Sequence, residues 1–242
     1  TKLWNKAYRD NSHQPAFTID AFNEVESQGK EMEEYFETQM KKIQEWKSEV
    51  VESGLALDIL AFHITDLGTS KRCAIEDIRR RYRHLAEQTD QPDIVDQLVN
   101  RLKSSEIFLL NDIGRGFTSL PHDTLAPIIM REYNRSDKLG QRSARILDTK
   151  RPDFIRALLT KDERKVRLDD NDLEVVKGGI RGMRALEEEE KTLLQISMEE
   201  REKRLKLRRI LVRGGIVAGL FILFLAVMAG MLSVSVTQQL KN

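Results

Sequence analysis

The residues best suited to chemistry lie in a short basic run that ends in a histidine. The segment Arg79–His84 contains four arginines and one tyrosine before the histidine. The imidazole of His84 could act as a general acid and base, and the guanidinium of Arg79 could stabilise charge on a phosphate. Together these two side chains would suit the cleavage of a phosphodiester bond.

The spacing of this pair, an arginine and a histidine separated by four residues, resembles the motif of HEPN-type ribonucleases. The resemblance implies an all-helical nuclease in which His84 moves protons and Arg79 holds the phosphate, and it covers only these two residues. The alternative interpretation is a solvated basic face, with Ile78 and Leu85 turned inward, that meets an acidic partner protein or acidic lipid. We favour this second interpretation, because a run so rich in arginine often produces a two-residue motif by chance.

Other catalytic and ligand-binding patterns are missing from the sequence. The glycines at 114, 116, 178 and 179 lack the spacing and the Lys-Ser/Thr ending of a phosphate-binding loop. The single cysteine, Cys73, and four scattered histidines offer no zinc-ligand spacing. We interpret His63 as a hydrogen-bonded core histidine and Cys73 as a small packing residue. The sequence therefore predicts no catalytic, cofactor or metal site and a chain that is not an enzyme.

The amino-acid composition limits which binding partners and which cellular compartment are expected. Charged residues make up 33% of the 242 residues, but acidic and basic side chains nearly cancel, with a formal net charge of +1. A nucleic-acid-binding domain usually carries a clear basic excess, so we expect no nucleic-acid partner. One cysteine cannot form an intramolecular disulfide, which favours a reducing compartment for the body.

A long apolar segment near the C-terminus predicts a transmembrane helix. No charged residue lies between Gly214 and Leu240, and Ile216–Leu232 is almost wholly apolar. A helix rises about 1.5 Å per residue, so roughly 20 such residues span a hydrocarbon core of about 30 Å. We predict a single membrane-spanning helix over residues 214–236, followed by a short tail over 237–242.

Basic residues crowd the N-terminal side of this segment and predict its orientation. Positive residues remain on the cytoplasmic or matrix side, so the body is expected there. Loss of a presequence before Thr1 would fit a mitochondrial protein, and we favour the mitochondrial inner membrane over a bacterial inner membrane. The juxtamembrane basic residues are Arg201, Lys203, Arg204, Lys206, Arg208, Arg209 and Arg213.

Small residues form one stripe along the predicted span. Gly215, Gly219, Ala226 and Gly230 recur at separations of four, seven and four residues. Small side chains let helix backbones approach closely in lipid, so this stripe predicts packing against a partner helix. The proteins expected to contact this chain are therefore other subunits, together with membrane lipid.

The body in front of the membrane segment predicts an all-α fold. Residues 1–17 read as an extended arm, and residues 18–54 as a long amphipathic helix whose apolar seam over 19–53 could form a coiled coil within or between chains. Residues 55–169 form a helical body with helices over 55–67, 71–88, 92–113 and 122–133 and another that opens at Pro152. Residues 170–213 are predicted to be one stalk helix that continues into the membrane.

These features favour a non-catalytic structural or assembly subunit of a multi-subunit membrane complex, such as a respiratory or ATP-synthase-type assembly. Two alternatives remain. One is a membrane-tethered HEPN-like ribonuclease or effector that uses Arg79 and His84. The other is a tail-anchored tether of the SNARE kind, which is disfavoured because Pro152 and Gly178-Gly179 interrupt any heptads over residues 145–209.

Overall fold

The computed structural model describes the backbone of residues 19–88, 92–162 and 165–239. Within these ranges, side chains are described from residue 29 to residue 212, and at 216 and 219–221. The predicted arm over residues 1–17 and the end of the tail, 240–242, lie outside the described residues.

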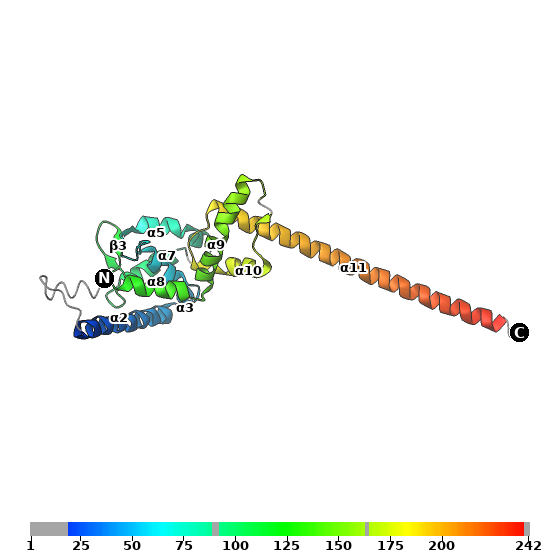
Figure 1. Ribbon diagram of the computed structural model, residues 1–242, viewed down its shortest axis with the longest axis horizontal. Coiled ribbons are helices and arrows are strands. Elements are labelled where there is room, and N and C mark those ends of the chain that lie inside the picture. The colour runs from blue at the N-terminus through cyan, green and yellow to red at the C-terminus, as the bar shows by residue number, and fades with distance from the viewer. Residues whose placement is uncertain (1–18, 89–91, 163–164, 240–242) are drawn as a thin grey trace.

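The described chain is mostly helical, which confirms the predicted fold class at this level (Figure 1). It also contains a three-stranded antiparallel sheet in the order β1-β3-β2, which the sequence did not predict. Strands of two or three residues are too short to show an alternating pattern. The strands are β1 (Cys73–Ala74), β2 (Asn111–Asp112) and β3 (Phe117–Ser119). The helices are α2 (Ile19–Trp46), α3 (Ser48–Glu52), α4 (Leu55–Phe62), α5 (Ile75–Arg81), α6 (Arg83–Gln88), α7 (Ile94–Lys103), α8 (Leu125–Arg135), α9 (Leu139–Leu159), α10 (Asp170–Gly179), the 3-10 helix η2 (Ile180–Gly182) and α11 (Glu188–Gln239).

The first hydrophobic core surrounds α4, the helix that the sequence marks as the most apolar. Ile59 and Leu60 are completely buried, and every residue from Leu55 to Leu60 is buried. The helix ends at Phe62 rather than at the predicted residue 67, because the chain turns back so that Ile64 pairs with Ser70. Helices α2, α3, α5, α6, α7 and α8 also contribute to this core, together with Ile107, Leu109 and Leu110 from the segment after α7.

In the described chain, the segment from α4 to β3 combines four helices with the three short strands. Helix α4 precedes β1, the helices α5 to α7 follow, and the hairpin β2-β3 pairs with β1.

The predicted helix over residues 19–53 is divided and packs within the chain over its described part. It breaks at Lys47, between α2 and α3. Phe36, Ile43 and Val50 are buried in the first core. The hydroxyl of Tyr35 also donates a hydrogen bond to the carbonyl oxygen of Ile107 at 2.9 Å. Figure 1 shows α2 lying along one side of the body beside α8.

Several other predicted boundaries move because tertiary contacts end or extend the helices. The predicted helix 71–88 is split at Tyr82, which is buried, and 92–113 ends at Lys103. Pro152 does not open a helix but lies inside α9, a single helix of 21 residues that starts at Leu139. Proline removes one hydrogen bond from a helix, yet the buried Phe154 and Ala157 still hold this part of α9 against the body.

The predicted stalk helix over residues 170–213 is also divided. Helix α10 starts after the cap Asp169, whose carboxylate accepts a hydrogen bond from the amide of Asp172 at 2.7 Å. The chain leaves the helix after η2, turns, and begins α11 at Glu188. The stalk therefore corresponds only to the part of the predicted helix from Glu188 onward. A second hydrophobic core, which includes Leu147, Phe154 and Leu193, joins α9, α10 and the start of α11.

Helix α11 is continuous over 52 residues and leaves the body as a long rod (Figure 1). Among the residues that the structure describes, no helix is long and apolar enough to cross a membrane. The predicted span over 214–236 falls mostly at positions whose side chains lie outside the described residues, including Gly215, Ala226 and Gly230. At Gly219, which is described, no other atom lies within 4 Å of the position that a Cβ would take.

Candidate functional site: the junction between the body and the stalk helix

The structure directs Arg79 and His84 to different neighbours. The Nε of Arg79 donates to Asp96 on α7 at 2.9 Å, and its side chain is exposed. His84 is buried, and its Nε2 donates to the carbonyl oxygen of Ile180 in η2 at 2.9 Å. Burial lowers the pKa of His84. The two side chains share no hydrogen-bonding partner in the described chain, so this geometry favours structural roles for both.

His63 is a core histidine, as expected from its position on the apolar helix. Its Nδ1 lies 2.8 Å from the carbonyl oxygen of Ile59, and its Nε2 lies 2.8 Å from the hydroxyl of Thr118. Cys73 is buried as well, and its thiol contacts the carbonyl oxygen of Phe62 at 3.4 Å. Within the described residues, no group of three or more His, Cys, Asp or Glu side chains could hold a metal ion.

The burial of His63 predicts that acid destabilises the body. Desolvation lowers the pKa of His63 in the folded chain to about 4, whereas an unfolded histidine has a pKa of about 6.5. The unfolded state therefore binds more protons between these values, and this group costs stability as the pH falls from about 6.5 to about 4. The full loss is about 3 kcal/mol, measurable by urea denaturation in mild detergent at a series of pH values.

Two substitutions separate this effect from general acid denaturation. His63→Gln should lower stability at pH 7 because its two buried hydrogen bonds change, but should flatten the loss between pH 6.5 and 4. His122→Gln, in an exposed turn, should leave the slope as in the wild type. An unchanged slope in His63→Gln would contradict the assignment.

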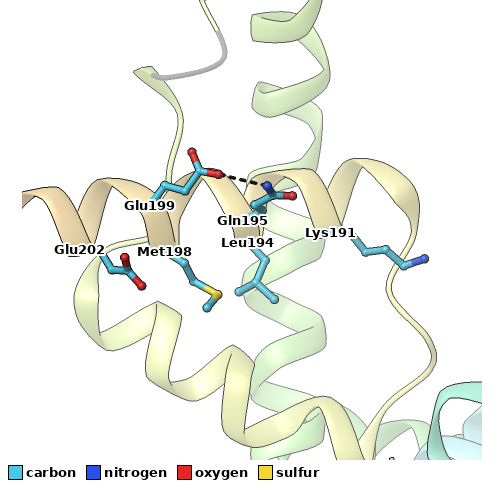
Figure 2. Close-up of a pocket in the computed structure, with 6 residues that line it drawn as sticks. All are labelled: Lys191, Leu194, Gln195, Met198, Glu199 and Glu202. Atoms are coloured by element: carbon cyan, nitrogen blue, oxygen red, sulfur yellow. Dashed lines mark hydrogen bonds between the residues drawn. The ribbon is translucent and has the colours of Figure 1, made fainter. Parts of the chain in front are cut away.

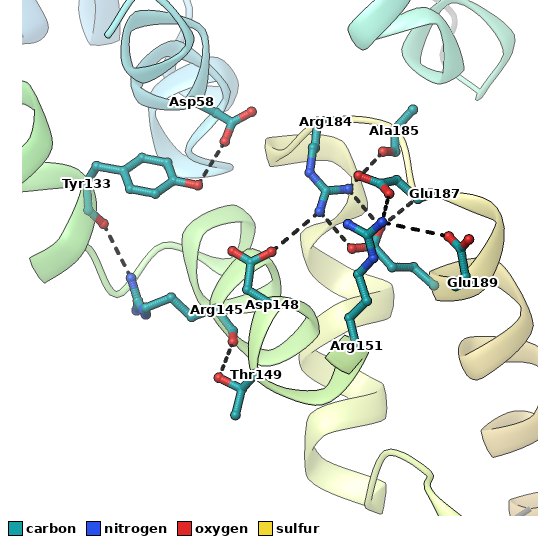
Figure 3. A network of polar contacts seen from close by, with 11 residues as sticks. Asp58, Tyr133, Arg145, Asp148, Thr149, Arg151, Arg184, Ala185, Glu187 and Glu189 are labelled. Carbon is teal, nitrogen blue, oxygen red and sulfur yellow. Dashed lines mark hydrogen bonds and ion pairs between the residues drawn. The ribbon is translucent and has the colours of Figure 1, made fainter. Parts of the chain in front are cut away.

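A chain of polar contacts connects the two hydrophobic cores (Figure 3). The buried carboxylate of Asp58 accepts hydrogen bonds from the hydroxyls of Tyr82 at 2.7 Å and Tyr133 at 3.2 Å. Burial raises the pKa of Asp58, although the two tyrosine hydroxyls and nearby arginines oppose the shift. Arg145 of α9 continues the chain by donating to the carbonyl oxygen of Tyr133 at 3.3 Å. The first core is thus joined to α9 through polar groups that are buried at Asp58 and half-buried at Tyr133 and Arg145.

The start of the stalk is held by an ion pair that is almost completely buried. Both terminal nitrogens of Arg184 donate to the carboxylate of Glu190, each at 2.7 Å. The side chain of Arg184 is 13% exposed and that of Glu190 is 0% exposed. Asp148 on α9 lies 3.5 Å from the same guanidinium (Figure 3). Bidentate pairing of this kind is directional, so it orients the first turn of α11 against the segment that precedes it, and Asp148 connects that segment to α9.

Glu190 also caps the stalk helix. Its carboxylate accepts a hydrogen bond from the backbone amide of Glu187 at 2.8 Å, which satisfies one of the free N–H groups at the start of α11. Burial alone would raise the pKa of Glu190, but the hydrogen bonds from Arg184 and the Glu187 amide outweigh it and hold the pKa below the ordinary value. On α9, Arg151 pairs with Glu187 and lies 3.9 Å from Glu189.

Further along, α11 is held against α10 by a second set of ion pairs. Arg201 pairs with Glu174, and Arg204 pairs with Asp170 at 2.8 Å. The hydroxyl of Ser197 accepts a hydrogen bond from the buried amide of Leu168 at 2.9 Å. We call the contacts of residues 184–204 with α9 and α10 the junction, because they attach the stalk to the body.

The predicted juxtamembrane basic run is divided by these contacts. Besides Arg201 and Arg204, Lys203 pairs with Glu200 at 3.0 Å, and Lys206 lies 3.7 Å from Glu202. Arg208 and Arg209 form no ion pair with the described part of the chain. The side chain of Arg213 lies outside the described residues.

The junction also carries a shallow groove on one side of α11 (Figure 2). It has a volume of about 280 Å³, with Leu194 and Met198 as apolar lining and Lys191, Gln195, Glu199 and Glu202 around them. Gln195 and Glu199 are joined by a hydrogen bond of 3.0 Å. None of these side chains is a histidine, cysteine or serine, and we assign the groove no reaction.

The sequence did not reveal the junction. By charge alone, the run Glu187–Glu190 is typical of a polar surface, whereas the side chain of Glu190 is buried. The sequence feature that could have indicated this helix start is the spacing of Glu187 and Glu190, which fits a capping contact. Comparisons with family profiles, with curated proteins and with solved structures found no match for this chain.

Proposed function

We propose that this chain is a non-catalytic assembly subunit of a membrane complex. In this proposal, α11 crosses the membrane over residues 214–236, and the body lies on the cytoplasmic or matrix side of a mitochondrial or bacterial inner membrane. The observation that carries the proposal is the continuity of α11. The helix begins inside the second core and runs without interruption into the apolar segment.

Exposed apolar side chains beyond the junction support the membrane assignment. Leu207 is 61% exposed and Leu211 is 74% exposed, and Ile210, Ile216 and Phe221 are also exposed. Together with the exposed Val212 and Leu220, these residues lie on all sides of the helix, and a helix that is apolar on all sides needs an apolar environment. No Asp or Glu occurs after Glu202, which suits a segment close to a membrane.

The junction supports an assembly role because it makes the stalk a rigid spacer. Residues 205–213 separate the last contact with α10 from the predicted span, and at about 1.5 Å per residue they cover roughly 14 Å. A body held at this distance could position partner subunits next to the bilayer. We propose that partners pack on the stripe Gly215, Gly219, Ala226 and Gly230 within the membrane, and on the outer face of α2.

An alkaline-extraction experiment tests the membrane anchor. The full chain should remain with membranes after washing at high pH. Leu225→Arg, at the midpoint of the predicted span, should lower the membrane-bound fraction, because an arginine at the centre of a membrane helix costs about 3 kcal/mol. The matched control is Leu211→Arg in the exposed stalk, which should extract like the wild type. Release of the wild type by alkali, or equal behaviour of both variants, would contradict the anchor.

The assembly role is tested by solubilising native membranes in a mild detergent and sizing the chain with its companions. A large assembly of constant composition is expected. A free monomer or a small homo-oligomer would overturn this role without affecting the anchor.

A further inference from the structure

Two arginines of the stalk, Arg208 and Arg209, differ from the other basic residues whose side chains the structure describes there. Arg201 and Arg204 are held by carboxylates of α10, and Lys203 and Lys206 by carboxylates of α11. Arg208 and Arg209 are exposed and have no ion pair with the described chain. Their charges are therefore available to a partner.

The side chains around these arginines favour a lipid surface over a soluble acidic protein. Leu207, Ile210 and Leu211 lie beside them on α11 and are all exposed. A mixture of exposed leucine, isoleucine and arginine on one helix matches the boundary between acyl chains and headgroups. The sequence has no acidic residue after Glu202 that could neutralise the two guanidinium groups.

The distance of Arg208 and Arg209 from the predicted span agrees with the position of lipid phosphates. Arg208 precedes Gly214, the start of the predicted span, by six residues, which corresponds to about 9 Å along a helix. The headgroup layer on each side of a bilayer is roughly 5–8 Å thick. The long arginine side chains can reach across the remaining difference, because their aliphatic stems tolerate apolar surroundings.

We propose that Arg208 and Arg209 form a binding site for the headgroups of anionic phospholipids. This inference rests on the proposed membrane anchor. A guanidinium group binds phosphate oxygens through two parallel hydrogen bonds, which a lysine cannot reproduce. Each arginine close to an anionic surface contributes about a five-fold preference, so the pair gives a preference of roughly thirty-fold.

Native mass spectrometry of the full chain tests the site. The chain is released from mixed micelles that contain equal amounts of phosphatidylglycerol and phosphatidylcholine, and the lipids that remain bound are counted. The wild type should retain phosphatidylglycerol in excess. R208Q/R209Q should lower the ratio of the two bound lipids by roughly thirty-fold.

The matched control is R201Q/R204Q, which removes the same charge from the same helix. Its arginines are already occupied by Glu174 and Asp170, so its lipid ratio should stay close to that of the wild type. Equal loss in both double variants would show a general charge effect and overturn the site, as would a wild type without preference.

Alkaline extraction distinguishes this failure from failure of the anchor. R208Q/R209Q keeps the apolar segment and should remain with membranes after the wash. If the wild type resists alkali but shows no lipid preference, only the headgroup site is wrong. If the wild type is released by alkali, the anchor itself is wrong.

Discussion

Replacing Arg184 with methionine is expected to lower the free energy of unfolding by about 3–5 kcal/mol. The substitution keeps most of the side-chain volume but leaves the carboxylate of Glu190, which is 0% exposed, without its partner. An unpaired buried charge is far more costly than the loss of an exposed ion pair. Urea denaturation of the full chain in mild detergent, followed by circular dichroism, measures the change.

The pH dependence gives this prediction a second readout. Without Arg184, burial should raise the pKa of Glu190 above its unfolded value, so the folded variant would bind a proton more readily than the unfolded one. Stability lost at pH 7 should then partly return as the pH falls towards the unfolded pKa. The difference between wild type and variant should therefore narrow on acidification.

Two further variants define the contribution of the pair. R184M/E190M removes both charges and should be less destabilised than R184M, because no buried charge remains. Lys191→Met removes the exposed pair of Lys191 with Glu188 from the same turn of α11 and should change stability by less than about 1 kcal/mol. A loss in R184M no larger than that in Lys191→Met would contradict the role of the buried pair.

Replacing Gly182 with alanine is expected to destabilise the body by about 3 kcal/mol or more. At this position, η2, the start of α9 and the end of α3 approach through their backbones. A Cβ on Gly182 would overlap the carbonyl oxygen of Ser53, and one on Gly140 would lie 2.7 Å from the same oxygen. Backbone atoms cannot move aside as a flexible side chain can. The amide of Gly140 also donates to the Ser53 carbonyl at 3.0 Å, so displacement would break a hydrogen bond.

Gly29 provides the matched control for this effect. It lies inside α2, and no atom lies within 4 Å of the place that its Cβ would take. Gly29→Ala should raise stability by roughly 0.5–1 kcal/mol, because alanine favours a helix more than glycine does. Opposite signs for the two alanine variants in thermal unfolding are the expected result. Equal small effects would show that the close approach at Gly182 relaxes easily.

Local patterns predicted the helical class and the main core helix. The dense apolar residues of α4 identified the centre of the first core, and the predicted start of the stalk helix at residue 170 coincides with the start of α10. Helix ends were predicted less well. The chain leaves η2 at Gly182 against the backbone of Ser53, a neighbour distant in the sequence that a local pattern does not contain.

The sequence by itself determined that the chain is mainly helical and that an uncharged apolar segment follows a basic run. These properties depend on composition and on spacing within a few turns. Only the tertiary structure decided which of the basic residues are occupied. Arg201 meets Glu174 across 27 positions of sequence, whereas Arg208 has no ion pair with the described part of the chain. Pairing depends on distance in space, and folding brings together charges whose separation along the chain carries no signal.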